Sequence, residues 1–99
     1  MEFVKSVEVI ITSLIVDFEL PFAFSLKDRR KIINSIKDKL KKFNLSILDI
    51  SSEYHKEATL AICYLSHNIL DAKQYKEKIE NFLYRNFPEF EFYFEYEFI

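Results

Sequence analysis

The sequence contains no glycine and no tryptophan, and only two prolines and one cysteine among its 99 residues. Without glycine, the chain cannot build the glycine-rich loops that cradle phosphate groups, nor the dinucleotide-binding fingerprint. The turns must instead use asparagine, serine and proline, which hydrogen-bond to their own backbone or fix φ. These absences exclude the commonest classes of nucleotide-binding enzyme.

The single cysteine, Cys63, excludes a disulfide within the chain and favours a reducing, cytoplasmic compartment. Because Cys63 lies in an apolar run, we expect a small core residue with an unreactive thiol. The apolar run at 7–16 is interrupted by Glu8 and is too short for a membrane span, which needs about 20 apolar residues. We therefore expect a strand there and no attachment to a membrane.

Apolar residues are plentiful and the charges are segregated. Hydrophobic residues make up 49% of the chain, enough for one core without metals or disulfides, so we predict a single domain over residues 1–99. The net charge is only −2, yet residues 27–42 hold eight of the fourteen basic side chains. Residues 89–97 hold four glutamates and no basic residue. This pattern predicts a domain with a basic side and an acidic side.

The first periodic block covers residues 3–20 and has the two-residue alternation of a half-buried strand. Upstream of Thr12 the apolar positions switch to the opposite phase, which predicts a β-bulge or break near Thr12 and Ser13. We interpret residues 1–11 as an N-terminal extension of this strand.

Two capped helices are predicted, at about 26–42 and 69–87. Ser25 and Asn68, each followed three residues later by aspartate, have the pattern of an N-cap with an acidic first turn. Apolar residues then recur at the helical period, which predicts one buried stripe on each helix. The stripes comprise Leu26, Arg29, Ile32, Ile33, Ile36, Leu40 and Phe43 in the first helix, and Ala72, Tyr75, Ile79, Phe82, Leu83 and Phe87 in the second.

The remaining blocks are strands. Two apolar runs, 45–50 and 58–65, flank a polar stretch and predict a β-hairpin. In the last block, 89–98, aromatic residues alternate with mostly acidic ones, so we expect Phe90, Phe92, Phe94, Tyr96 and Phe98 to point into the core. The order β-α-β-β-α-β predicts an α+β fold of the ferredoxin-like type, a four-stranded antiparallel sheet with two helices on one face.

The most specific local motif is Ser25-Leu26-Lys27-Asp28-Arg29-Arg30, which enters the basic helix. With Phe43-Asn44-Leu45-Ser46, Ala58-Thr59-Leu60 and two single positions, Pro21 and Ser66, it makes the segment 20–68 resemble the YlxP-like family, small bacterial domains of unknown function. The resemblance implies a ferredoxin-like fold. Because members are often encoded among translation and ribosome-maturation genes, it also implies an accessory role there. Phe22-Ala23-Phe24 replaces the usual Gly-Ala-Arg of that family.

No catalytic, cofactor-binding or metal-binding constellation stands out, so we expect a non-enzymatic protein with no cofactor. Glu53, His55 and Glu57 alternate, and in a strand they would project from one face at intervals of about 6–7 Å. Such a set resembles a metal site, but nothing supplies a fourth ligand or outer-shell support. A solvated hairpin tip is the preferred interpretation, and an enzyme with an unidentified substrate is a further alternative.

The basic helix suggests a nucleic-acid hypothesis. Its candidate RNA-binding or partner-binding residues are Lys27, Arg30, Lys31, Lys37, Lys41 and Lys42. A merely solvated helix face is the competing interpretation. Base stacking on the sheet is not expected, because Thr59, Ala61 and Cys63 would lie beside a strand that presents glutamates. If RNA binds, we expect it on the helix side.

The third strand is apolar on both sides, which predicts association through the sheet. Leu60, Ile62 and Tyr64 are expected to meet the helices, leaving Ala61, Cys63 and Leu65 on the side that meets a second copy or a protein partner. The opposite phase, with Leu65 in the core, is the alternative. Our leading hypothesis is therefore a cytoplasmic interaction domain, most simply a homodimer, with phosphate-directed RNA binding as the second hypothesis.

Overall fold

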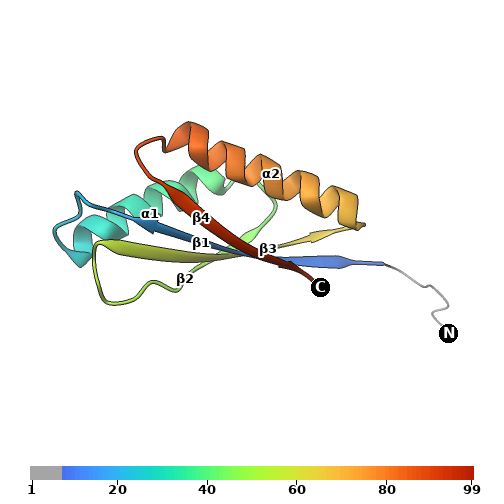
Figure 1. The fold of residues 1–99 in the computed structure, drawn as a ribbon, viewed down its shortest axis with the longest axis horizontal. Helices are drawn as coiled ribbons and strands as arrows, with labels where there is room; N and C mark the ends of the chain where they lie inside the picture. The colour runs from blue at the N-terminus through green and yellow to red at the C-terminus, as the bar shows by residue number, and fades with distance from the viewer. Residues whose placement is uncertain (1–7) are drawn as a thin grey trace.

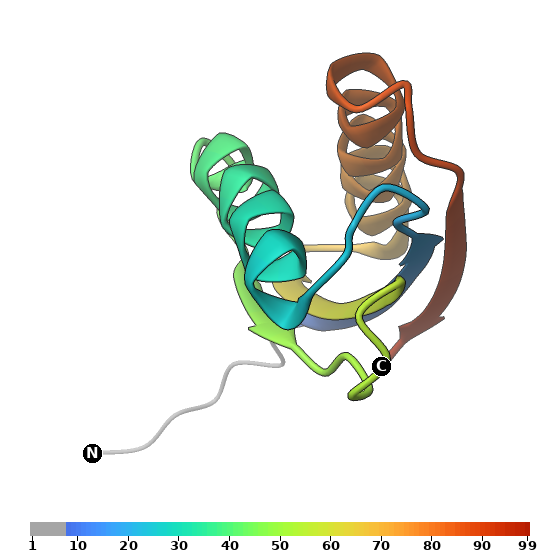
Figure 2. The same ribbon diagram turned by 90° about the vertical axis from the view of Figure 1, so that its left-hand side faces the viewer.

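Both helices pack on one face of a single antiparallel sheet (Figures 1 and 2). The structure is a computed structural model and describes residues 8–99. The strands are arranged in the order β2-β3-β1-β4, and every neighbouring pair is antiparallel. The predicted ferredoxin-like fold is therefore confirmed. Its elements are β1 (Ile10–Glu19), α1 (Leu26–Leu40), β2 (Ser46–Asp49), β3 (Glu57–Ser66), α2 (Ile69–Asn86) and β4 (Phe92–Phe98).

The core lies between the sheet and the helix layer. Alternate residues of the two central strands, among them Leu14 and Val16 on β1 and Leu60 on β3, are fully or almost fully buried. They pack in one cluster with residues such as Ile36 of α1 and Ile79 of α2. Burying each large aliphatic side chain contributes about 1.5–3 kcal/mol, so this layer provides most of the stability.

The long β1–β3 ladder runs without a break from Ile10↔Ser66 to Glu19↔Glu57. The predicted bulge near Thr12 and Ser13 is therefore wrong. Thr12 occupies an inward, fully buried position, because a β-branched threonine fits the alternation that begins at Ile10. Of the proposed N-terminal extension, residues 10 and 11 belong to β1, whereas residues 1–7 lie outside the described residues.

Both predicted helix caps are present. The Ser25 Oγ accepts a hydrogen bond from the backbone N–H of Asp28 at 3.1 Å, and the Asp28 carboxylate accepts one from the backbone N–H of Phe24 at 3.0 Å. At the start of α2, the Asn68 Oδ1 accepts from the backbone N–H of Asp71 at 2.9 Å. These bonds satisfy N–H groups that the first turn of a helix leaves free.

Two residues placed in the core by their periodicity are largely exposed. Leu26 is 46% exposed, because it lies in the first turn of α1, at the end of the domain. Tyr96 is 54% exposed, because β4 is an edge strand and the Tyr84 ring of α2 packs on Phe92 and Phe94 in its first half and not on Tyr96. Farther along β4, the Lys76 ammonium lies 4.4 Å from the centroid of the Tyr96 ring.

We predict that Ser25→Ala lowers the free energy of unfolding by about 1 kcal/mol, because the Asp28 N–H loses its acceptor. The measurement is urea unfolding followed by circular dichroism. Ser35→Ala is the matched control: Ser35 is exposed in the interior of α1, where alanine is the better helix former. Equal loss of stability in the two variants would contradict a capping role for Ser25.

Candidate functional site

The outward face of the sheet carries an apolar patch that no helix covers. Ile11 of β1 lies between Leu65 of β3 and the C-terminal Ile99, with which it exchanges backbone hydrogen bonds of 3.0 and 2.8 Å. Four residues from Leu65 on the same face of β3, Ala61 lies between Ile15 and Leu48. We call this surface the outer apolar patch; it comprises Ile11, Ile15, Leu48, Ala61, Cys63, Leu65 and Ile99.

The patch contains the three residues that the sequence suggested for self-association. Leu65 is 63% exposed, whereas Tyr64 points to the helices and is buried, so β3 has the expected phase. Cys63 is also exposed, and the prediction of a buried core cysteine is therefore wrong. An apolar run does not define one buried face, and here the thiol faces outward between Ser13 and Ser46 of the adjoining strands.

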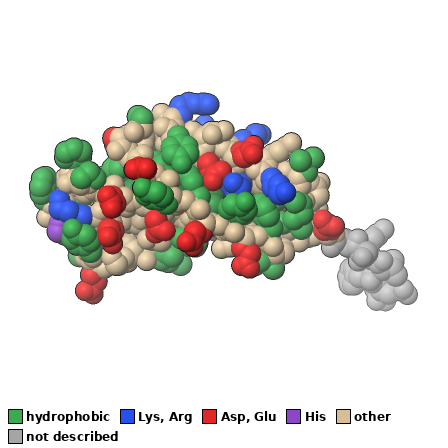
Figure 3. Space-filling model, viewed as in Figure 1, with side chains coloured by type: hydrophobic (Ala, Val, Ile, Leu, Met, Phe, Trp, Pro, Cys, Tyr) green, Lys and Arg blue, Asp and Glu red, His purple; other side chains and the backbone are tan. Residues whose placement is uncertain are grey.

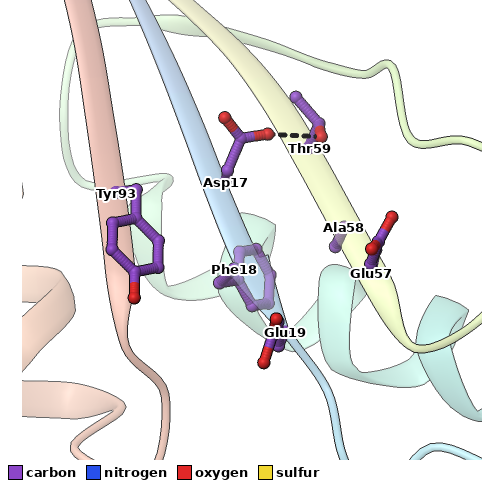
Figure 4. Close-up of a pocket in the computed structure, with 7 residues that line it drawn as sticks. All are labelled: Asp17, Phe18, Glu19, Glu57, Ala58, Thr59 and Tyr93. Carbon is purple, nitrogen blue, oxygen red and sulfur yellow. Dashed lines mark hydrogen bonds between the residues drawn. The ribbon is translucent and has the colours of Figure 1, made fainter.

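Carboxylates border the outer apolar patch along one side and at one end. Glu95 and Glu97 follow the edge strand β4. At the far end, a cavity of about 270 Å³ is lined by Asp17, Phe18, Glu19, Glu57, Ala58, Thr59 and Tyr93 (Figure 4). Glu19 and Glu57 are direct cross-strand partners. This negative potential disfavours a phosphate-rich ligand on the outward face.

The chemistry available in the acidic cavity is limited. The Asp17 carboxylate accepts a hydrogen bond of 2.6 Å from the Thr59 hydroxyl, so one of its oxygens is already occupied. Hydrogen bonding to the Glu91 carboxylate raises the pKa of the Tyr93 phenol above its ordinary value, and this phenol stays protonated at neutral pH. Within residues 8–99, no three His, Cys, Asp or Glu side chains are grouped as metal ligands.

Arg29 holds the β2–β3 hairpin, although its periodicity predicted a position in the buried stripe of α1. One guanidinium nitrogen of Arg29 donates to the carbonyl oxygens of Ser52, Tyr54 and Glu57 at 2.7, 2.9 and 3.1 Å. Arg29 thus fixes the loop that carries Glu53 and His55. We assign it a structural role rather than a binding role.

The helix layer carries most of the positive charge. The two helices, with Lys41 and Lys42, hold twelve of the fourteen basic residues but only five of the sixteen acidic ones. Figure 3 shows one face of the molecule, on which acidic side chains lie in the upper as well as the lower half of the view and several basic side chains lie along the top. The predicted polarity is therefore a property of the two layers: positive on the helices, negative on the sheet and loops.

The six basic residues suggested for RNA binding do not converge on one site. Lys27, Arg30 and Lys31 are exposed along the first turns of α1. Lys37 and Lys41 line a separate cavity together with Leu45 and with Ile47 of β2. Of the six, Lys42 alone lines a space between α2 and the segment that follows α1.

That space, which we call the interhelical groove, has a volume of about 340 Å³ and is lined by Lys42, Phe43, Lys78, Asn81, Phe82 and Arg85. The Lys42 ammonium lies 4.1 Å from the centroid of the Phe82 ring and 5.5 Å from that of Phe43. Sequence reasoning missed the contribution of α2. The signal was present, since positions 78, 81, 82 and 85 lie on one face at the helical period.

The chain matches a family model described as Protein of unknown function (DUF503) over residues 11–94. The chain belongs to this family. Its description assigns no activity, and the YlxP-like resemblance is compatible with it. The match takes in both helices and most of the sheet.

Among solved structures, the chain is similar to a de novo designed protein, Foldit4, with a TM-score of 0.54. The sequences are 10% identical, and the alignment covers 91% of this chain and 97% of the designed one. At this identity the likeness shows the fold alone. The comparison with curated proteins found no match. In the described part of the chain, no helix has the length and apolar character needed to cross a membrane.

Proposed function

We propose that this domain is a non-enzymatic interaction module that pairs with a second copy of itself through the outer apolar patch. The observation that carries the proposal is the exposure of Ile11, Leu48, Leu65 and Ile99 on a face that no element of the described chain covers. A contiguous apolar surface on a monomer usually marks an interface, and a two-fold pair is the simplest way to bury it.

The acidic border restricts how two copies fit together. A two-fold axis across the strands would stack each acidic β4 strand on its counterpart, which brings like charges together. An axis along β3 instead places β4 of one copy over the β2 side of the other. The glutamates at positions 95 and 97 then lie at the rim in water, and Ala61 and Cys63 lie near the centre. The second arrangement is the one we propose.

This pairing leaves the helix layers free, because the helices pack on the opposite face of each sheet (Figure 2). Each pair would then present two positively charged layers pointing away from each other. We propose that these layers contact a partner in cytoplasmic translation or ribosome maturation. The family resemblance supports that setting, and the excess of positive charge suits a ribonucleoprotein surface.

Phosphate-directed RNA binding by the helix layer is the second candidate function. The specific observation that favours it is the segregation of twelve basic residues onto one layer in a chain whose net charge is −2. Recognition would depend on charge and shape rather than on base edges, because the sheet lies on the other side and its outward face is apolar with an acidic border.

We predict that the wild-type protein sediments at micromolar concentration with twice the 12.0 kDa mass of the chain. Leu65→Glu should convert it to a monomer while circular dichroism keeps the native spectrum, because the new carboxylate would be buried without a partner in the interface. Leu70→Glu is a matched control: Leu70 is 64% exposed, close to the value for Leu65, but lies on α2.

Three results would count against the pairing. A wild-type protein that sediments as a 12.0 kDa monomer would refute self-association. Dissociation by Leu70→Glu but not by Leu65→Glu would move the interface to the helices. Unfolding of Leu65→Glu would place Leu65 in the core and reverse the phase of β3.

We predict that replacing Arg30, Lys31 and Lys37 together by glutamate weakens RNA binding for every sequence and flattens its dependence on salt. The reason is that each lost phosphate contact removes about 0.7–0.9 from the slope of log K against log salt concentration. Binding of two unrelated single-stranded RNAs is measured at several salt concentrations. Retained, salt-sensitive binding by the triple variant would exclude the outer surface of α1.

The biological setting is tested by affinity capture of the protein from its native cytoplasm, with identification of the RNA and proteins that co-purify. We expect ribosomal particles or their precursors, enriched over a Leu65→Glu capture performed in parallel if pairing is needed for that contact. Enrichment of neither ribosomal RNA nor ribosomal proteins would overturn the proposed role in translation.

A further inference from the structure

We infer that the interhelical groove is a binding site for a phosphate group, supplied either by a single nucleotide or by the backbone of an RNA strand. This inference rests on the second proposed function and deepens it. It places the principal phosphate contact in the groove, on residues that include Lys78, Asn81 and Arg85, and leaves the exposed cations of α1 as secondary contacts.

The fold brings the groove residues together from separate parts of the chain. Lys42 follows the last turn of α1, where the chain leaves the helix for β2. Lys78 and Arg85 stand about two turns apart on α2, with Asn81 between them. The edge-to-face contact between Phe43 and Phe82, with ring centroids 5.2 Å apart, holds the two segments side by side. The site is therefore built where the segment that follows α1 packs against α2.

The groove has positive charge and no carboxylate in its lining. Lys42, Lys78 and Arg85 contribute three cations. Among residues 8–99 the ion pairs are Lys41 with Asp38 and Lys76 with Glu80, so none of the groove cations has a carboxylate partner there. Their mutual repulsion is relieved by an anion bound between them.

The donors in the groove match the chemistry of a phosphate. The Arg85 guanidinium offers a planar fork that pairs with two phosphate oxygens at once, and the lysines add mobile point charges. The Asn81 amide contributes neutral N–H donors. Contact with the faces of Phe82 and Phe43 holds the Lys42 ammonium at the groove before a ligand arrives, which reduces the entropy lost on binding.

The basic residues elsewhere on α1 lack this arrangement. Lys41 is paired with Asp38 at 3.0 Å, and Lys37 lies with it on the side of the helix that faces β2. Lys27 and Arg30 are exposed, and the Asp28 carboxylate lies between them in the chain. An anion on that surface meets neighbouring cations of a single helix in water, where each contact is weak and strongly screened by salt. The groove is the place in the described helix layer where cations from two elements converge.

The test compares two double variants of equal charge in the full chain. Lys78→Glu with Arg85→Glu removes the groove cations, whereas Lys27→Glu with Arg30→Glu removes two exposed cations of α1. The probes are a fluorescent single-stranded RNA of ten nucleotides and adenosine monophosphate. We expect the groove variant to lose at least about tenfold in RNA affinity and the α1 variant to lose less. The reason is that the groove cations would contact one phosphate group together, whereas the exposed α1 cations would not.

A second readout follows the side-chain resonances of Asn81 and Arg85 in isotope-labelled wild-type protein. Shifts on adding the mononucleotide would identify a nucleotide as sufficient, whereas shifts with RNA alone would identify the strand as the source of the phosphate. Should the glutamate pair fail to fold, Lys78→Gln with Arg85→Gln removes the charges without adding new ones, and the same loss of affinity is expected.

The outcomes separate this inference from the function on which it rests. RNA affinity that falls in the α1 variant and is unchanged in the groove variant would overturn the groove site and leave RNA binding intact. Binding of the mononucleotide in the groove without RNA binding would support the site and overturn the RNA function. No shift of Asn81 or Arg85 with either probe, and no RNA binding, would overturn both.

Discussion

One-sided packing of the sheet is the constraint on which the rest of the molecule depends. Each strand turns alternate side chains to opposite faces, and the two helices cover only one of them. Leu14, Val16, Leu60 and Ile62 form the covered face and are fully or almost fully buried. Every other surface property follows, because the uncovered residues of the same strands must face water or a partner, and the outward sides of the helices must carry charge.

Elements with strong local signals could be predicted from the sequence. The aspartates that follow Ser25 and Asn68 placed both helix starts, since capping bonds form within four residues and need no tertiary information. Tertiary context decided the rest. Thr12 is polar but buried, because the alternation of β1 turns its side chain toward the core. Tyr96 is aromatic but exposed, because it lies on an edge strand that α2 covers only in part.

The candidate surfaces were predictable to different degrees for the same reason. Alternation along a strand is local, so Ala61, Cys63 and Leu65 could be grouped on one face before their environment was known. The exposure of Cys63 could not be predicted in the same way. The interhelical groove joins Lys42 to Arg85 across more than forty positions of the sequence. Its composition depends on how the segment that follows α1 packs against α2, a relation that neither segment encodes alone.

The separation of charge between the two layers would allow one small chain to make the two proposed kinds of contact. A cation on the sheet would weaken the acidic border that orients the proposed pair, and a carboxylate in the groove would cancel the proposed attraction for phosphate. Because the two layers lie on opposite sides of the core, the helix layer can be positive and the sheet negative without either charge neutralising the other. Pairing through the sheets would also carry two grooves on one particle, so that a ligand long enough to reach both would bind more tightly than either groove alone allows. Packing both helices on one face of the sheet thus leaves the other face uncovered and also keeps the outward sides of the helices accessible.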